Sequence, residues 1–281
     1  MGDPEIGLDT LRRHWNGVVE RIRQNRVQVG VRISMDEYDL RNCLKYFPQL
    51  VGIRPKKYLF VHIPKNGGMS IRHAAQLEGR ITIANRHRLK SKKYADMLRK
   101  TMSEARAHPG FEHARLKDIN TWVLRSHIPF AIVRNPWSRV FSRFMFAIQT
   151  RNWDFEETCN KAGFEAFLEE RHTWGDMDFA WHRAVRGWHQ QVDYLRTDDG
   201  DIIPNILRQE VLSEDVKRFF DLRDELEKVN VTKGPRMNYK DFYTDRTIQV
   251  VADWYEADVA TFGFDFDRMA TRNTLFGAEA V

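Results

Sequence analysis

Residues 58–77 read Tyr-Leu-Phe-Val-His-Ile-Pro-Lys-Asn-Gly-Gly-Met-Ser-Ile-Arg-His-Ala-Ala-Gln-Leu, and this stretch decides the fold. Its first six residues form an apolar run of β-branched and aromatic side chains, which is long enough for a buried strand. Pro64 to Gly68 interrupt that pattern, and from Met69 the residues suit a helix that Gly79 is placed to end. The sequence therefore predicts a strand, a tight glycine-containing loop and a helix.

The loop between this strand and this helix has the composition of an anion-binding site. Backbone N–H groups at a strand-to-helix junction point at one spot, and the positive end of the helix dipole lies behind them. Gly67 and Gly68 allow a close approach of the backbone or a positive φ. Lys65 adds a positive charge and Ser70 a hydroxyl, so the loop suits a phosphate ester. The alternative is an ordinary turn in which the glycines have only a conformational role.

The order of residues in the loop distinguishes between classes of phosphate-binding protein. A Walker A loop has Lys after its last glycine, whereas Lys65 precedes both glycines, so an ATP-binding loop of that type fits badly. The order Pro-Lys-x-Gly-Gly-x-Ser resembles instead the 5′-phosphosulfate-binding loop of sulfotransferases that use 3′-phosphoadenosine 5′-phosphosulfate (PAPS). It is most similar to the carbohydrate-type group, sulfotransferase family 2, related to heparan sulfate 2-O-sulfotransferase. The resemblance implies that the 5′ end of the donor is held by Lys65, Asn66, Gly67, Gly68, Met69, Ser70 and Ile71.

This chain departs from the family pattern at two loop positions. Family members usually carry Thr where Asn66 and Met69 stand here. Met69 has no hydroxyl, so one phosphate contact expected from the family is either missing or made by the backbone only.

A second motif follows the other clearly predicted strand, Phe130–Val133. The chain continues Arg134-Asn-Pro-Trp-Ser-Arg-Val-Phe-Ser142 into a helix, and by itself this order marks a strand end with Pro136 in the first helical turn. The pattern Arg-x-Pro-x-x-Arg-x-x-Ser also resembles the 3′-phosphate-binding motif of the family. The resemblance implies a bidentate contact from Arg134 and a hydroxyl contact from Ser142. Since α/β sheets bind ligands at the carboxyl ends of their strands, we expect the two motifs to lie together.

The resemblance extends from about Tyr58 to Phe266 and implies an α/β fold. The expected architecture is a P-loop-like three-layer sandwich, with a central, mainly parallel sheet flanked by helices, plus an N-terminal helical extension. A length of 281 residues is more consistent with one such domain than with two. We expect an N-terminal helical extension at 1–55, a sulfotransferase domain at 56–268 and a tail at 269–281.

Other elements are predicted from periodicity and capping residues. They are helices over about Thr10–Gln24 and from the capping box Ser34–Glu37 to about Phe47, a short strand at Ile81–Ala84, a basic helix over Ser91–Ala107, a strand within Ile202–Glu210, a helix capped by Ser213 and running to about Leu226, and a last long helix capped by Thr244 or Asp245 and ended by Gly263.

Positive charge is concentrated in the half of the chain that carries both motifs. The whole chain has 45 Lys+Arg and 39 Asp+Glu, but residues 51–151 alone have 21 Lys+Arg against 5 Asp+Glu. Such a surplus suits a polyanionic ligand, and the alternatives are a solvated basic face or a nucleic-acid patch. Since the sequence lacks a recognition helix, a stacking platform and zinc-ligand spacing, we expect no nucleic-acid partner.

The compartment is expected to be the cytoplasm. No apolar run approaches the roughly 18 residues needed to span a bilayer. The first residues lack the basic-then-apolar layout of a signal peptide, and the two cysteines, Cys43 and Cys159, form no disulfide framework. We therefore expect an enzyme without a membrane anchor.

The resemblance implies transfer of a sulfuryl group from PAPS to an acceptor hydroxyl, with release of the bisphosphate PAP. Lys65 is expected to stabilise charge on the leaving phosphate, and no metal is expected. The acceptor is expected to be a saccharide, by analogy with the carbohydrate-type group and because the stretch Thr173–Leu195 is rich in Trp, His and Gln. Such a stretch is more often an aromatic core, and a lipid or small alcohol stays open as the acceptor. The alternative functions are a P-loop-type kinase or NTPase, and a non-catalytic module that binds anions or nucleic acid.

A histidine is the expected general base, because its pKa suits proton transfer near neutral pH. Relatives place the base between the two phosphate motifs. His87, just beyond the predicted strand at 81–84, is our first choice, and His113 is the second. His127 precedes its strand and is expected at the wrong end of the sheet, while His62 precedes the loop within a strand and is expected to be structural.

Overall fold

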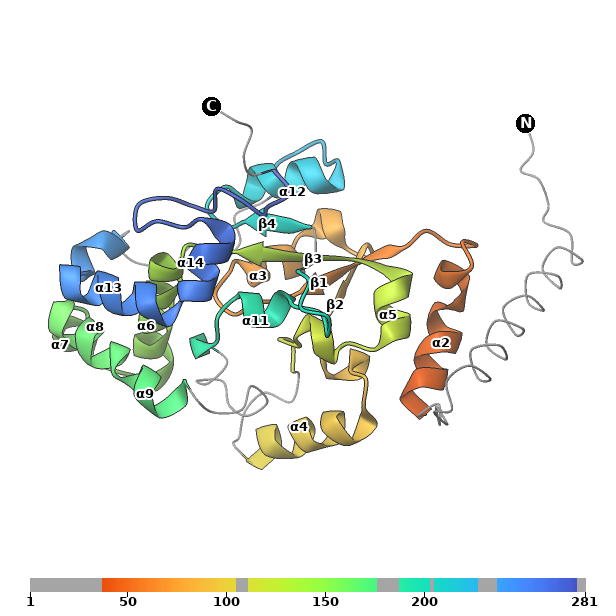
Figure 1. Cartoon of the computed structure of the whole chain (residues 1–281), viewed down its shortest axis with the longest axis horizontal. Coiled ribbons are helices and arrows are strands. Elements are labelled where there is room, and N and C mark those ends of the chain that lie inside the picture. The colour runs from red at the N-terminus through yellow and green to blue at the C-terminus, as the bar shows by residue number, and fades with distance from the viewer. Residues whose placement is uncertain (1–36, 105–110, 176–186, 203–204, 227–236, 277–281) are drawn as a thin grey trace, which may run out of the picture.

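A computed structural model of the chain describes residues 37–104, 111–175, 187–202, 205–226 and 237–276 (Figure 1). Its centre is a single four-stranded sheet in the order β2-β1-β3-β4, and every pair of neighbouring strands is parallel. The strands are β1 (Lys57–Val61), β2 (Ile81–Ile83), β3 (His127–Val133) and β4 (Ile206–Arg208).

The two faces of the sheet are both covered. Side chains alternate between faces along each strand, so Leu59 and Val61 belong to one core while Phe60 belongs to the other. The larger core packs against α4, α5, α6, α8, α11, α13 and α14, and the smaller core against α3 and α12. Figure 1 shows α12 on one side of the sheet and α4 and α11 on the other. The predicted three-layer α/β sandwich with a parallel sheet is therefore confirmed.

The helices connect and flank the strands in chain order. They are α2 (Glu37–Leu50), α3 (Gly68–Arg72), α4 (Lys92–Glu104), α5 (Thr121–Ser126), α6 (Pro136–Arg151), α7 (Phe155–Thr158), α8 (Lys161–Leu168), α9 (Glu170–Trp174), α11 (Val192–Leu195), α12 (Leu212–Phe220), α13 (Asp245–Trp254) and α14 (Glu256–Phe262), with short 3₁₀ turns at Ala75–Leu77, Arg86–Arg88, Leu116–Asp118 and Tyr239–Phe242.

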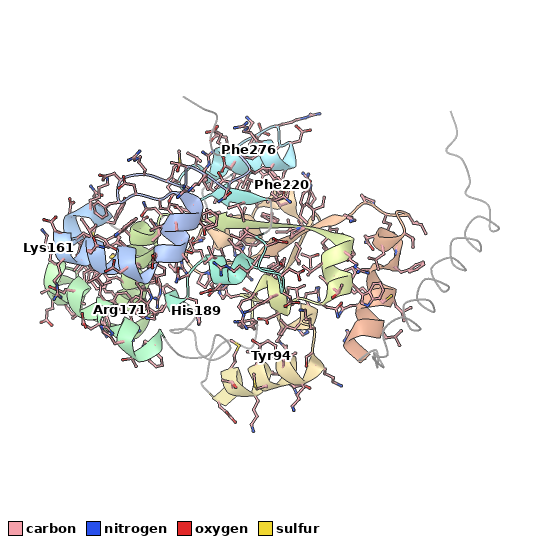
Figure 2. All side chains as sticks on the ribbon, viewed as in Figure 1. Tyr94, Lys161, Arg171, His189, Phe220 and Phe276 are labelled. Carbon is pink, nitrogen blue, oxygen red and sulfur yellow. The ribbon has the colours of Figure 1, made fainter. Side chains whose placement is uncertain are left out.

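Side chains fill the space on both sides of the sheet (Figure 2). Phe220 packs in the smaller core with Phe276 against it, and both lie on the α12 side in Figure 2. Tyr94 belongs to α4, packs against the larger core and lies on the opposite side. The aromatic residues are thus divided between two layers rather than gathered in one.

The end of the sheet at which the strands begin is distinct from the end that carries the loops. In Figure 1, α2 and α5 lie where β3 begins, and α6 and α14 lie where it finishes. α2 packs against α5, which runs directly into His127, the first residue of β3. The helix expected over residues 10–24 lies outside the described residues.

Several predicted boundaries differ from those in the structure. The predicted cap at Ser213 is wrong, because α12 begins at Leu212 with Val211 at the N-cap position and no side-chain cap. The same helix stops at Phe220 rather than Leu226, because Asp221 adopts a left-handed conformation with φ 51°. β3 begins three residues before the predicted strand.

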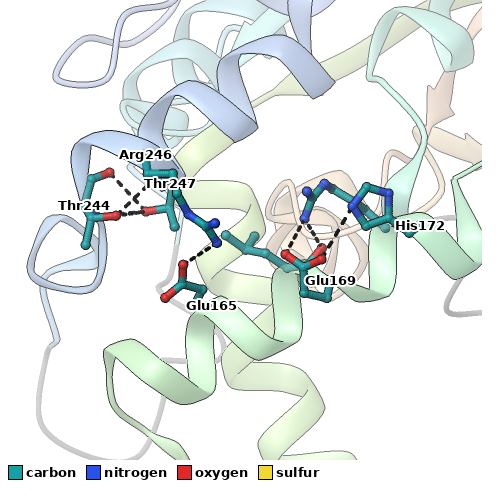
Figure 3. Close-up of polar contacts among 8 residues, drawn as sticks. Glu165, Glu169, His172, Thr244, Arg246 and Thr247 are labelled. Atoms are coloured by element: carbon teal, nitrogen blue, oxygen red, sulfur yellow. Dashed lines mark hydrogen bonds and ion pairs between the residues drawn. The ribbon is translucent and has the colours of Figure 1, made fainter.

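The start and end of the last helical segment agree with the prediction. Thr244 caps α13 in a capping box with Thr247, as Figure 3 shows. Next to the cap, Arg246 forms an ion pair with Glu165 and so joins α13 to α8 (Figure 3). Gly263, with φ 66°, ends α14, but the segment is two helices because the chain breaks from helical geometry at Tyr255.

Part of the predicted tail contacts the domain. The backbone N–H of Leu275 donates a 2.8 Å hydrogen bond to the carbonyl of Ile206 in β4. Ala270 is buried, and Thr271 donates its backbone N–H to the carbonyl of Phe262. The described residues of the tail are therefore tied to the sheet and to α14.

Candidate functional site

The first predicted loop forms the connection between β1 and α3. Lys65 and Gly67 both adopt left-handed backbone conformations, with φ 69° and 76°. Gly67 is the N-cap residue of α3, and its carbonyl accepts a 3.0 Å hydrogen bond from the N–H of Ser70. A lysine with positive φ carries backbone strain, which is tolerated mainly at functional sites. The predicted strand and tight loop are confirmed, but α3 ends at Arg72 rather than at Gly79, and a separate 3₁₀ turn follows at Ala75–Leu77.

Gly68 is needed for a different reason, namely space. A Cβ atom at this position would lie 1.8 Å from Nε2 of His62. The His62 ring is itself fixed, because it is buried and stacks on Phe60 with 5.2 Å between ring centroids. The loop therefore packs directly onto this ring, which gives His62 the structural role expected from the sequence.

Gly68→Ala is expected to destabilise the fold by about 1–3 kcal/mol, because the new methyl group overpacks against the His62 ring. Removing the ring removes the obstacle, so the double variant His62→Ala/Gly68→Ala should lose much less than the sum of the two single losses. Denaturant unfolding of the four proteins measures this coupling. Strictly additive losses would show that the contact does not constrain the loop.

The second predicted motif lies against the first. The Nη1 atom of Arg134 donates a 3.1 Å hydrogen bond to the carbonyl of Lys65. Its Nε and Nη2 atoms lie 2.9 and 2.7 Å from Oγ of Ser138, one turn into α6. These contacts place the guanidinium of Arg134 between the two loops.

Arg134 is positively charged at neutral pH despite its burial. Burial lowers the pKa of Arg134 to about 10, an effect that the nearby carboxylate of Glu210 opposes. At neutral pH the side chain is therefore positively charged. Ser142 lies one turn beyond Ser138 on the same side of α6 and is partly exposed, so a hydroxyl follows the guanidinium along the helix.

Lys65 is directed toward the same helix. Its Nζ atom lies 4.4 Å from the centroid of the Phe146 ring on α6, a cation–π distance. Phe146 is one turn beyond Ser142, so the amine, the hydroxyl and the guanidinium all lie along one helix. The charged groups that the sequence singled out are therefore brought together.

The side chains of two other loop residues have different surroundings. Asn66 is only 1% exposed, and its Nδ2 atom donates 2.7 Å hydrogen bonds to the carbonyl of Ile132 and to Oε1 of Gln191. Met69 is 41% exposed. The side chain of Asn66 holds the loop onto β3, so this position offers a ligand only its backbone groups.

The candidate bases are separated by the fold. Nδ1 of His113 lies 2.8 Å from the carbonyl of His62, and the two rings are 4.3 Å apart between centroids. Since His62 also contacts Gly68, only the His62 residue lies between His113 and the phosphate loop. The structure therefore brings the second predicted base to the site.

His87 lies elsewhere. His87 is exposed at the surface. Its pKa is lowered first by the partial burial of the ring and then by the positive charges of four nearby residues, Arg86, Arg88, Arg41 and Lys45. The last two belong to α2, at the end of the sheet where the strands begin. The structure thus does not bring His87 to the loop, because the 3₁₀ turn after β2 directs it toward α2.

His127 is at the amino end of β3, as predicted. Its Nδ1 atom contacts the carbonyl of Val123 at 2.9 Å, and burial lowers its pKa to about 4, against the raising effect of that hydrogen bond. The imidazole is therefore neutral near pH 7. His127 lies at the opposite end of β3 from Val133, after which the Arg134 motif begins.

Three buried residues that the sequence analysis did not single out support the site. Arg139 is fully buried, and its Nε and Nη1 atoms donate to the carbonyls of Pro64 and His189 at 3.2 and 3.0 Å. Gln191 and Asp258 are also fully buried and bond to each other. Arg139 stood within a recognised motif and Gln191 within the Trp- and Gln-rich stretch, but Asp258 carried no local signal, because a polar residue usually indicates surface.

The Trp- and Gln-rich stretch is largely core where the structure describes it. Trp188 is 2% exposed and lies under the guanidinium of Arg143, 4.2 Å from the ring centroid to Cζ. Residues 176–186, which include Trp181 and His182, lie outside the described residues. The core alternative is therefore confirmed for Trp188 and Gln191, and neither presents a face to an acceptor.

Two searches of the described residues bear on metal and membrane binding. Among them, no group of three or more His, Cys, Asp or Glu side chains is arranged to hold a metal ion. None of the helices within these ranges has the length and apolar character to cross a bilayer.

The comparison with known families matches most of the chain. A family model described as the sulfotransferase family matches residues 53–265. This span contains the sheet, both loops, His113 and the buried supporting residues. Searches of the curated proteins and of the solved structures gave no match.

Proposed function

The chain belongs to the sulfotransferase family, and from this premise we propose that it transfers a sulfuryl group from PAPS to a hydroxyl group of a saccharide and releases PAP. Membership of the family makes the protein a sulfuryl transferase and implies the PAPS donor. The saccharide acceptor rests on the resemblance of the two motifs to the carbohydrate-type group. A cytoplasmic location stays a prediction from the sequence.

The observation that carries the proposal is the direct contact between the two motifs. Arg134 donates to the carbonyl of Lys65, so the two loops lie side by side, which supports one shared site for a ligand with a phosphate at each end of a nucleoside. In the proposed complex, the backbone N–H groups of residues 66–69 bind the 5′-phosphate, and Arg134 with Ser142 binds the 3′-phosphate. The 3′ contacts distinguish PAPS from ATP, which has no phosphate at that position.

The proposed reaction is an in-line displacement at sulfur. The acceptor oxygen forms a bond to sulfur while the bond from sulfur to the bridging oxygen of the 5′-phosphate breaks, and PAP leaves with the negative charge. Lys65 stabilises that charge as it develops, in the way that positive groups assist phosphoryl transfer. The acceptor loses its proton to a general base.

We propose His113 as that base, in place of His87. The carbonyl of His62 lies 2.8 Å from Nδ1 of His113, and in the neutral ring a proton on Nδ1 donates to this carbonyl. Nε2 is then unprotonated and able to accept the proton of the acceptor. This assignment uses the histidine next to the loop rather than the exposed one beside α2.

His113→Ala is expected to lower kcat by about 10²–10⁴-fold, the usual contribution of a general base. His87→Ala is the matched control and should leave kcat within about twofold, because His87 lies away from the loop. A greater loss of kcat in His87→Ala than in His113→Ala would reverse the assignment.

The acceptor is identified most directly by a transfer assay. ³⁵S-labelled PAPS is incubated with the enzyme and with separate panels of glycans, lipids and small alcohols. The proposal expects label in the glycan panel, and label confined to lipids or small alcohols would contradict the saccharide assignment while leaving the reaction class intact.

A further inference from the structure

Gln191 occupies the point at which the two loops meet. Its Oε1 atom accepts hydrogen bonds from Nδ2 of Asn66 at 2.7 Å and from the backbone N–H of Arg134 at 2.9 Å. Its Nε2 atom donates to the carbonyl of Arg134 at 2.9 Å and to Oδ2 of Asp258 at 3.2 Å. A side-chain amide has two lone pairs and two N–H groups, so this amide uses its full capacity.

The bonds to Arg134 replace those of a neighbouring strand. β3 ends at Val133, whose carbonyl still accepts from the N–H of Gln209 just beyond β4. At Arg134 the chain leaves the sheet, and Gln191 bonds to both its N–H and its carbonyl. Buried backbone groups without partners are costly, so these bonds fix the peptide from which the guanidinium reaches Lys65.

Gln191 is itself held in place from α14. The carboxylate of Asp258 accepts hydrogen bonds from the backbone N–H groups of Gln191 and Val192, each at 2.9 Å. Asp258 is fully buried, and burial raises its pKa to about 6, against the lowering effect of Arg139. The amide is therefore a rigid link rather than a mobile side chain.

We propose that Gln191 is a positioning residue that fixes the distance between the 5′-phosphate loop and the 3′-phosphate loop. This inference rests on the proposed function. A nucleotide with both phosphates gains affinity when the two loops are already at the correct spacing, because no binding free energy is spent on ordering them. A nucleotide with one phosphate uses one loop and gains little from the link.

The test compares three nucleotides on matched variants. Gln191→Met keeps the size of the side chain and removes all four hydrogen bonds. Gln190→Met is the control, because the Gln190 amide bonds to the backbone N–H of Ala257 on α14 rather than to either loop. Titration calorimetry without metal measures the Kd of each protein for PAP, 3′-AMP and 5′-AMP.

Gln191→Met is expected to bind PAP about tenfold more weakly or worse, while its affinity for each monophosphate changes by less than about threefold. Gln190→Met should bind PAP within about twofold of the wild type. Unchanged PAP affinity in Gln191→Met, or an equal loss for all three nucleotides, would overturn the proposal, since an equal loss indicates a merely structural role.

A second variant makes the result independent of whether Gln191→Met folds. Asn66→Ala removes the loop's end of the link and leaves Gln191 on Arg134 and Asp258, and it should give the same selective loss of PAP affinity. Wild-type protein that binds neither PAP nor 3′-AMP would instead refute the proposed function, and this inference with it.

Discussion

Lys65→Ala is expected to reduce kcat for sulfuryl transfer by at least about a hundredfold while changing the unfolding temperature by only a few degrees. The loss of rate follows from removing a fixed positive charge next to the leaving phosphate. The change in stability is expected to be small because the cation–π contact of the amine with Phe146 is worth about 0.5–1 kcal/mol. Steady-state kinetics and thermal unfolding measure the two effects separately.

Lys90→Ala is the control for this prediction. Lys90 belongs to the same basic half of the chain, and its amine forms an ion pair with Asp198 rather than contacting α6. Replacing Lys90 changes the net charge by the same amount as replacing Lys65. Because the amine of Lys90 pairs with Asp198, the kcat of Lys90→Ala should stay within about twofold of the wild type. If Lys65→Ala and Lys90→Ala lose activity alike, the effect is general electrostatics, and if Lys65→Ala loses stability in proportion to its activity, Lys65 is a structural residue.

Arg134→Met is expected to raise the KM for PAPS by about a hundredfold or more. A charged hydrogen bond to a phosphate contributes about 1.5–3 kcal/mol, and a guanidinium is able to form two. The same variant should use adenosine 5′-phosphosulfate, which lacks the 3′-phosphate, about as well as the wild type does. The ratio of kcat/KM for the two donors is therefore the measurement, and it should approach one.

Arg80→Met is the matched control for Arg134→Met. Arg80 donates to the carbonyl of Phe220, in the layer that contains α12, and lies in the same basic half. Its donor preference should equal that of the wild type. A variant at Arg134 that loses activity equally with both donors would mean that the residue supports the loop through Lys65 and does not contact the 3′-phosphate.

The two strand–loop–helix units were predictable because their signals are local. The apolar run before Pro64 and the run before Arg134 each predict a buried strand, and the residues that follow predict a loop and a helix start. Their meeting at one edge follows from parallel strands in neighbouring positions, and the pairing of β1 with β3 provides it. The family resemblance added the assignment of the 5′ and 3′ phosphates, which no periodicity provides.

The residues that link the loops were not predictable, because the interactions span long distances in the sequence. Asn66 and Gln191 are 125 residues apart, and Gln191 and Asp258 are 67 apart. A buried glutamine or aspartate has the same local pattern as a solvated one. Only the three-dimensional partners distinguish the two cases.

The choice between His87 and His113 depended on a turn direction. His87 is close in sequence to the end of β2, and a short distance along the chain suggested a short distance to the loop. The chain instead turns at Arg86–Arg88 toward α2, while Ala114, next to His113, donates its backbone N–H to the carbonyl of Ala84 at the end of β2. Turn direction depends on packing against distant elements, so the sequence alone does not show which of the two histidines lies nearer the loop.

The central claim is that two neighbouring loops bind opposite ends of one bisphosphorylated adenosine. Thermal unfolding with PAP in the absence of metal, against a parallel series with ATP and Mg²⁺, tests it most directly, since a ligand raises the unfolding temperature only if it binds the folded state. The account predicts a concentration-dependent increase with PAP and none with ATP and Mg²⁺. An increase with ATP and Mg²⁺ and none with PAP would contradict it.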